Sequence, residues 1–393
     1  MTATTEGIVR SQIETEIHGV CRPEFEPVRA AFARNFYLGA DIGASVAVFV
    51  DGEPVVDLCG GYFDATYTRP FERDTLVQGF SSTKTITALC ALILADRGEI
   101  DLDARVSKYW PEFAAEGKGD VMVRQLLGHT SGVAGWTDPT TLLDIYDREK
   151  STAALARQAP WWKPGRTSGY HGINQGHLVG EVIRRVTGKT LGKFLTEDVA
   201  TPLGVGREYY IGTPAEADPR VALLIKGRPY DRPMMSSRFD RSLWNPHPNV
   251  EDTWTVEFRR AEIGAVNGHG SARGIATLQS VLASGGANGK RLMSDAGRLR
   301  VLEQQSDGID LVLGIEARWG MGYSLLGNLF GAPPSARTAL WGGNGGSLAF
   351  VDLDTRMSIG YVPNRWLGGA FPISMERSIA IVRAAYESLA VTV

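Results

Sequence analysis

Cysteine is scarce in this sequence: its 393 residues include three, Cys21, Cys59 and Cys90, and no two have Cys-x-x-Cys spacing. An odd set of this kind predicts free thiols in a reducing compartment rather than a disulfide framework. No apolar run approaches the ~20 residues that a membrane span needs, and the N-terminal stretch has no apolar signal-peptide core. We therefore expect a cytoplasmic protein that makes no use of a membrane.

The sequence also has no large excess of positive or negative charge. The chain carries 41 Lys and Arg against 44 Asp and Glu, a formal net charge of −3. Such a balance provides no electrostatic basis for binding nucleic acid or an anionic membrane surface. Since 43% of the residues are hydrophobic and 22% are charged, the composition is typical of a folded protein, and the length allows two closely packed domains.

Several common catalytic signatures are missing. The chain has no Gly-x-Ser-x-Gly elbow of the α/β-hydrolases and no His-Glu-x-x-His. Its six histidines are not spaced as metal ligands, and its glycine clusters do not join a strand to a helix as nucleotide-binding loops do. We expect neither a metal ion nor a cofactor.

Strand-like patterns occupy both ends of the chain. Apolar, β-branched runs predict two strands that turn at Asp51-Gly52 and two more over residues 347–354 and 357–364. Helical periodicity marks residues 24–36, a helix from about Ser81, and a last helix over 374–390, while 97–113 has the charge of a solvated connection. We predict an α/β (α+β) fold, with 1–106 and 262–393 forming one domain and 107–261 a mostly helical one.

The stretch "SSTK" carries the clearest chemical signal, because it places Ser81 three residues before Lys84 at the start of an apolar helix. Residues i and i+3 share one helix face, so Oγ and Nζ can hydrogen-bond. A lysine accepts a proton near neutrality only when burial lowers its pKa, ordinarily about 10.4. Apolar neighbours such as Ile86 and Leu89 predict that burial. The spacing alone leaves two interpretations open, a nucleophile with its base or a solvated helix end.

Three more motifs follow in the chain. They are "VRQLLGHTSGV" at 123–133, "GYHGINQ" at 169–175 and "LWGGNGGSLAF" at 340–350. Together with "SSTK", they resemble the serine β-lactamase and penicillin-binding-protein superfamily, most closely the class C β-lactamase-like esterases called family VIII. The resemblance extends over roughly residues 36–364. It implies a β-lactamase-like fold, an antiparallel sheet flanked by helices, with the site beside the helical domain.

The resemblance also implies catalytic roles. Ser81 falls on the family's nucleophile and Lys84 on its base partner. Tyr170 falls on the tyrosine of the family's Tyr-x-Asn, but Gly172 stands at the third place, so the asparagine is missing and Asn174 is out of register. Which of Lys84 and Tyr170 removes the serine proton stays open, because two such groups titrate as a coupled pair.

The family's Lys-Thr-Gly element falls on Trp341, Gly342 and Gly343, and its oxyanion hole on the backbone amides of Ser81 and Asn344. In lactamases that lysine and hydroxyl grip a substrate carboxylate. Trp341 and Gly342 can do neither, and esterases of the family show such replacements. The expected activity is hydrolysis of neutral short-chain esters through an acyl-enzyme on Ser81. The alternatives are a β-lactamase, a D-amino-acid peptidase, or an inactive scaffold.

Other candidates stay ambiguous on the sequence alone. His171 is either a residue near the site or a structural histidine. Trp161, Trp162 and Trp244 either line a pocket or pack as ordinary core and surface residues. The expected partner is a small-molecule ester, and the sequence does not predict an oligomeric state.

Overall fold

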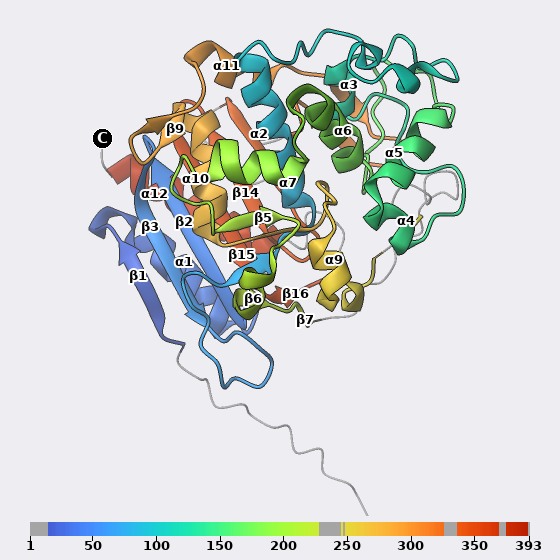
Figure 1. Cartoon of the computed structure of the whole chain (residues 1–393). Helices are drawn as coiled ribbons and strands as arrows, with labels where there is room; N and C mark the ends of the chain where they lie inside the picture. The colour runs from blue at the N-terminus through green and yellow to red at the C-terminus, as the bar shows by residue number, and fades with distance from the viewer. Residues whose placement is uncertain (1–14, 228–244, 247, 326–335, 369–374, 392–393) are drawn as a thin grey trace, which may run out of the picture.

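Both ends of the chain contribute strands to one antiparallel sheet (Figure 1). In the computed structural model of the protein, the described residues are 15–227, 245–246, 248–325, 336–368 and 375–391. The six strands, in their order across the sheet, are β1 (Ile17–Cys21), β3 (Glu53–Gly61), β2 (Gly43–Val50), β15 (Met357–Pro363), β14 (Leu348–Asp352) and β13 (Thr338–Gly342). All five pairings are antiparallel. The predicted antiparallel sheet is thus confirmed.

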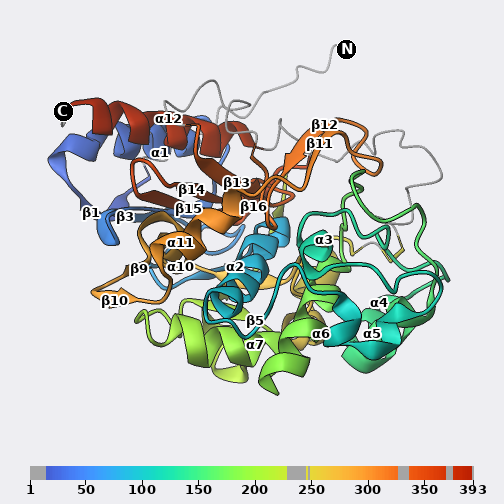
Figure 2. The ribbon, with the colours of Figure 1, turned by 90° about the horizontal axis from the view of Figure 1, so that it is seen from above.

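The sheet is covered by helices on both faces, as Figure 2 shows. Helices α1 (Glu26–Tyr37) and α12 (Glu376–Val391) lie on one face, and α10 (Ala272–Ser284) lies on the other. Strand β2 explains why: Val46 and Val48 join the apolar layer under α1 and α12, whereas Ala47 and Phe49 join the opposite layer. Successive side chains of a strand point to opposite faces, so a continuous apolar run requires cover on both.

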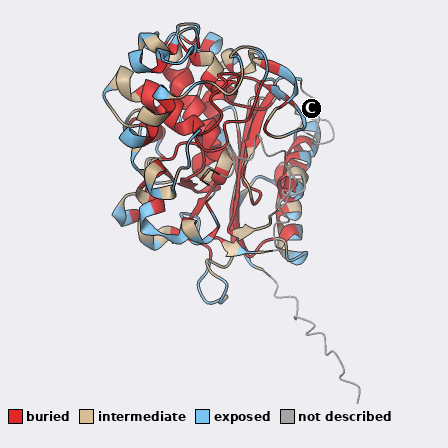
Figure 3. Cartoon of the chain, turned by 90° about the vertical axis from the view of Figure 1, so that its right-hand side faces the viewer, coloured by how far each residue is buried: buried red, intermediate tan, exposed pale blue. Residues whose placement is uncertain are grey.

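Helix α2 (Thr83–Asp96) runs through the interior next to α10. Every residue from Thr83 to Leu94 is buried, and Figure 3 shows that the buried residues gather in the interior of the molecule. A helix that is apolar on all sides is expected to be enclosed. This enclosure also places Lys84 in the first turn of α2 away from solvent, with 1% of its surface exposed.

A second group of helices packs beside α2 (Figures 1 and 2). These are α3 (Val123–Leu127), α4 (Leu142–Tyr146), α5 (Arg148–Arg157), α6 (Gln175–Thr187) and α7 (Leu191–Phe194). Helix α9 (Val256–Arg260) lies near the lower edge of this group in Figure 1. Helix α11 (Asp295–Leu299) does not belong to the group and lies beside α10. Residues 195–200 continue α7 as a π-helical turn.

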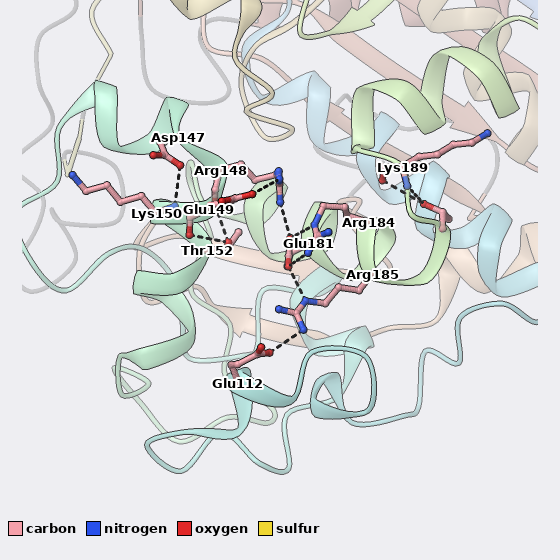
Figure 4. A network of polar contacts seen from close by, with 11 residues as sticks. Glu112, Asp147, Arg148, Glu149, Lys150, Thr152, Glu181, Arg184, Arg185 and Lys189 are labelled. Atoms are coloured by element: carbon pink, nitrogen blue, oxygen red, sulfur yellow. Dashed lines mark hydrogen bonds and ion pairs between the residues drawn. The ribbon is translucent and has the colours of Figure 1, made fainter.

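A buried carboxylate holds this helical group together (Figure 4). Glu181 of α6 is 3% exposed and accepts hydrogen bonds from Arg184, Arg185 and Arg148. Arg185 also pairs with Glu112 at 2.8 Å. Three guanidinium groups compensate the charge of this buried carboxylate, so removing the carboxylate or one of its partners is expected to destabilise the helical group. The network therefore ties α6 to α5 and to the connection that follows α2.

Short strands form a second, smaller sheet and separate two-stranded pairs. A four-stranded sheet has the order β5 (Tyr209–Ile211), β8 (Gly268–Gly270), β4 (Leu76–Gln78) and β6 (Val221–Ala222). Two-stranded pairs are formed by β7 (Ile225–Lys226) with β16 (Arg365–Trp366), β9 (Gly286–Ala287) with β10 (Lys290–Arg291), and β11 (Ser306–Ile309) with β12 (Glu316–Trp319). The division at residues 106 and 262 stays a prediction, since β5 and β6 pair across it.

The structure contains several of the elements predicted from the sequence and corrects one of the predictions. The hairpin at Asp51-Gly52, the helices predicted near 24–36, from about Ser81 and over 374–390, and the late strands are all present. The prediction that 97–113 is a solvated connection is wrong, because Trp110 and Phe113 are 2% and 0% exposed. The motif "WGGNGG" begins at Trp341, near the end of edge strand β13.

The part of the chain that the structure describes contains neither a disulfide nor a membrane-spanning helix. Its three cysteines form no disulfide. None of its helices combines the length and hydropathy needed to cross a bilayer.

Candidate active site

The candidate nucleophile lies where strand β4 turns into helix α2. A 3₁₀ turn, Phe80–Ser82, makes the junction, and Phe80 has a φ of 45°. Positive φ is uncommon for a bulky residue and marks a position that surrounding contacts hold in place. Ser82 is 1% exposed and donates to the Gly79 carbonyl at 2.9 Å. Of the two adjacent serines, the partly buried Ser81 is therefore the one that faces Lys84.

Lys84 makes three short polar contacts. Its Nζ lies 3.3 Å from Ser81 Oγ, 2.6 Å from the Gly172 carbonyl oxygen and 3.0 Å from the Ala265 carbonyl oxygen. A neutral amine has two N–H groups and one lone pair. The two carbonyls can accept both N–H groups, which leaves the lone pair directed at the Ser81 hydroxyl. The same three contacts accommodate the ammonium after it takes up a proton.

The protonation state of Lys84 depends on its surroundings. Burial lowers the pKa of Lys84 well below its ordinary value, and no carboxylate in the described part of the chain offsets that effect. Desolvation penalises the charged form of an ammonium, so the amine is favoured. The structure thus agrees with the predicted burial and brings Lys84 to Ser81.

Tyr170 completes the group from the loop before α6. Its side chain is 4% exposed, and Lys84 Nζ lies 4.7 Å from the centre of its ring. Trp341 donates its indole N–H to Tyr170 Oη at 2.9 Å. Burial raises the pKa of Tyr170, while hydrogen bonds with Ser81 and Trp341 oppose that rise. The phenol is therefore neutral at ordinary pH and hydrogen-bonded to the candidate nucleophile.

The glycine-rich loop after β13 lies against the turn that carries Ser81. A Cβ at Gly343 would overlap the Gly79 carbonyl oxygen, so only glycine allows this approach. Ser347, at the other end of the loop, donates to the same carbonyl at 2.6 Å. These contacts bring the segment that contains Asn344 next to the segment that contains Ser81. The two amides expected to form an oxyanion hole thus come from segments in direct contact.

Helix α12 supports the same loop from the opposite side. Arg377 is 5% exposed, pairs with Asp41 at 2.7 Å and donates to the Gly345 carbonyl. Asp41 also accepts a hydrogen bond from Tyr361. Gly345 has a φ of 102°, which a residue with a side chain rarely adopts. A buried ion pair therefore holds the backbone directly after Asn344.

The histidines near the site are buried and engaged with protein groups. His171 Nδ1 lies 2.7 Å from the Gly169 carbonyl, and Nε2 lies 2.6 Å from Ser131 Oγ. Burial lowers the pKa of His171 to about 4, so the ring is neutral. His129 accepts the His171 backbone N–H at Nδ1. These contacts fit a structural role for His171.

An aromatic cluster surrounds Tyr170. Its buried members include Trp319 and Trp341, and Trp161 and Trp162 pack against it. Trp244 lies outside the described residues. Because Trp161 and Trp162 are only partly buried, they form the accessible side of the cluster, whereas Trp319 is 1% exposed and stacks on Tyr170.

Sequence reasoning missed several groups at this site. The carbonyls of Gly172 and Ala265 hold Lys84, yet a backbone oxygen leaves no trace in residue type. Asp310 and Trp319, which contact Tyr170, are about 140 and 150 residues away along the chain. Their only local signal is an aspartate at a turn, which is common in loops.

A serine beside a buried lysine and tyrosine, at a helix start next to an antiparallel sheet, defines a protein of the β-lactamase-like class. The profile of the Beta-lactamase family matches residues 32–384. The chain therefore belongs to the Beta-lactamase family.

Known proteins of this family include esterases. The esterase/beta-lactamase LipL of Mycobacterium tuberculosis is 32% identical over 368 residues, which cover 89% of this chain and 83% of LipL. Esterase EstB of Burkholderia gladioli is 29% identical over 352 residues, covering 81% of this chain and 84% of EstB. The crystal structure of a family VIII carboxylesterase matches with a TM-score of 0.90 at 40% identity, covering 95% of this chain and 100% of the other.

Proposed function

We propose that this protein is a serine carboxylesterase that hydrolyses neutral short-chain esters through an acyl-enzyme on Ser81. The observation that carries the proposal is the contact of Ser81 Oγ with the Nζ of Lys84, which is almost fully buried. The similarity to LipL, to EstB and to a family VIII carboxylesterase supports the ester as the substrate class.

The contacts support an acyl-transfer mechanism. Ser81 Oγ attacks the ester carbonyl carbon while its proton passes to the coupled pair of Lys84 and Tyr170. The amides of Ser81 and Asn344 stabilise the oxyanion, each by about 3 kcal/mol. The pair returns the proton to the leaving alcohol as the C–O bond breaks. A water molecule then attacks the acyl-enzyme by the same route and releases the acid.

The substrate preference is inferred from Trp341 and Gly342, which replace a cation and a hydroxyl. A carboxylate placed beside the indole would lose its hydration without a charged partner, at a cost of several kcal/mol. Two nearby cations are engaged elsewhere, since Arg318 pairs with Asp307 at 2.9 Å and Arg365 donates to the Gly39 carbonyl. We therefore infer that neutral groups are preferred over anionic ones.

The cytoplasmic location of the protein and its division into two domains also belong to the proposal. Ser81, Lys84 and Trp341 come from the predicted α/β domain and Tyr170 from the predicted helical one, so the site would lie at their junction. Buried thiols suit a reducing, cytoplasmic compartment: burial raises the pKa of Cys59 to about 11, which keeps it protonated.

Two alternative functions follow from the same site. One is a β-lactamase or D-amino-acid peptidase, since LipL carries both esterase and beta-lactamase in its name. The other is an inactive scaffold, against which the contact of Ser81 with Lys84 and Tyr170 argues.

Turnover of three substrates separates the alternatives. A p-nitrophenyl ester of a short acid, a chromogenic cephalosporin and a D-alanyl peptide would be compared with the protein and with Ser81→Ala. We expect efficient turnover of the ester alone, abolished in the variant. Faster turnover of the cephalosporin or the peptide would replace the esterase assignment, and no turnover of any of them would favour the inactive scaffold.

A further inference from the structure

Asp310 is a fully buried carboxylate in the turn between β11 and β12. Its exposed fraction is 0%. Oδ1 accepts the backbone N–H groups of Val312 at 2.9 Å, Leu313 at 3.0 Å and Tyr170 at 2.9 Å. Oδ2 accepts the indole N–H of Trp319 at 3.1 Å. All four donors belong to neutral groups, so hydrogen bonds rather than a cation compensate the buried charge.

Only part of this arrangement is required by the turn. An aspartate that accepts the N–H groups two and three residues later is a common turn former, so the bonds from Val312 and Leu313 are local. The bonds from Tyr170 and Trp319 reach beyond the turn. Burying a carboxylate is costly unless its oxygens are satisfied. The two additional bonds therefore hold the distant Tyr170 segment and strand β12 of the same hairpin on one carboxylate.

Both additional bonds converge on the candidate catalytic tyrosine. One fixes the backbone of Tyr170 itself. The other orients Trp319, whose ring is stacked on that of Tyr170 with an interplanar angle of 13° and centroids 5.7 Å apart. Trp319 also contacts Trp341 at 4.8 Å between centroids, and Trp341 donates to Tyr170 Oη. Asp310 thus holds the backbone of Tyr170 directly and its ring face through Trp319. Trp341 holds the Tyr170 hydroxyl.

We propose that Asp310 is a positioning residue that sets the phenol of Tyr170 within reach of Ser81, through the Tyr170 N–H and the Trp319 indole. The inference rests on the proposed function, since it assigns Tyr170 to the proton relay. Loss of this support displaces a group in the transition state rather than one that binds the substrate ground state. A misplacement of about 1 Å costs roughly 100-fold in rate.

Asp310→Asn tests the proposal with little change in shape. The amide oxygen can keep the three backbone bonds, but an NH₂ group would then face the Trp319 N–H, donor against donor. We expect kcat for a p-nitrophenyl ester to fall about 10- to 100-fold with KM changed less than about threefold. Trp319→Phe keeps an aromatic ring beside Tyr170 but removes the indole N–H and part of the ring volume, so it should also lower kcat.

Asp352 provides a matched control at the opposite end of β14 from the glycine-rich loop. It is also 0% exposed, and its carboxylate accepts two backbone N–H groups of its turn and the hydroxyl of Tyr386. Asp352→Asn therefore removes a comparable buried charge away from Tyr170. We expect it to lower the melting temperature without lowering kcat.

A double-mutant cycle decides whether Asp310 acts through the phenol. Asp310→Asn and Trp319→Phe would each be combined with Tyr170→Phe, with rates measured by ester turnover and by covalent labelling with a p-nitrophenyl phosphonate. We expect neither substitution to slow the Tyr170→Phe protein by more than about twofold. Equal losses with and without the phenol would overturn the proposal, as would unchanged kcat in both single variants. Wild type and Ser81→Ala in the same assays report separately on the proposed esterase function.

Discussion

The indole N–H of Trp341 donates a hydrogen bond of 2.9 Å to the hydroxyl oxygen of Tyr170. Where the resemblance to lactamases leads one to expect a lysine that faces the substrate, this chain has a donor directed at a candidate catalytic group. The bond lowers the pKa of Tyr170 against the stronger effect of burial. Trp341 thus connects the proposed substrate preference with the proposed proton relay.

Trp341→Phe should lower kcat about tenfold, because the Tyr170 hydroxyl loses the donor that fixes its orientation and that would stabilise negative charge developing on its oxygen during proton transfer. Ester turnover as a function of pH measures the effect. Trp136→Phe is a matched control, since Trp136 is 2% exposed and its indole donates to Ser151 on the helical side. Unchanged kcat in Trp341→Phe would show that the bond has no catalytic role.

The proposed preference for neutral esters depends on Trp341 and Gly342, which have neither the cation nor the hydroxyl of the corresponding lactamase residues. A short-chain ester and its ω-carboxylate analogue form a matched substrate pair, and kcat/KM should favour the neutral ester by at least about 100-fold. The ratio of the two kcat/KM values reports differential binding of the transition state. A preference for the carboxylate analogue would reveal a cation in the site and contradict the proposed substrate class.

The stability of the protein should depend on pH through Lys84. Its pKa in the folded state lies below the ordinary value of 10.5. Between these two pKa values the unfolded chain binds a proton that the native state does not, so the free energy of unfolding rises with pH. The slope from one such group is at most about 1.4 kcal/mol per pH unit.

Lys84→Met lacks this titration, so subtracting its free energy of unfolding isolates the contribution of Lys84. Denaturant unfolding of both proteins from pH 7 to pH 10 should show the parent gaining stability relative to the variant as pH rises. A difference that stays constant over this range would mean that Lys84 is protonated in the folded protein, and it could not then act as the base.

Gly343→Ala should impair catalysis more than folding. The added Cβ overlaps the Gly79 carbonyl oxygen, which must separate the glycine-rich loop from the Ser81 turn. Misplacing one oxyanion donor costs about 100-fold in kcat. At Gly119 a Cβ would meet only the Ala114 carbonyl oxygen at 3.9 Å, so Gly119→Ala is the control. Equal kcat values for both variants would show that this loop does not contribute to the oxyanion hole.

The sequence predicted the parts of this site that depend on local spacing. Ser81 lies in the 3₁₀ turn that leads into α2 and Lys84 in the first turn of that buried helix, so their contact and the burial of Lys84 follow from one short segment. The hairpin at Asp51-Gly52 is local in the same sense.

What the sequence could not predict depends on long-range packing. Trp110 and Phe113 lie in a charged segment, yet they are buried because other helices cover them. Asp310 is indistinguishable from any turn aspartate until the fold brings Tyr170 to it. The two-residue and three-residue strands form only when a distant partner is in place, so periodicity does not reveal them.

The central claim is that Ser81, activated by Lys84, is the nucleophile, and covalent labelling tests it most directly. The protein would be treated with a p-nitrophenyl phosphonate, its intact mass measured and the adduct mapped by peptide, alongside Ser81→Ala and Ser82→Ala. Ser82 is the matched control, because its hydroxyl donates to Gly79 rather than facing Lys84. We predict one adduct on Ser81 in the parent and in Ser82→Ala, and none in Ser81→Ala. An adduct that persists in Ser81→Ala, or that maps to another residue in the parent, would contradict the account.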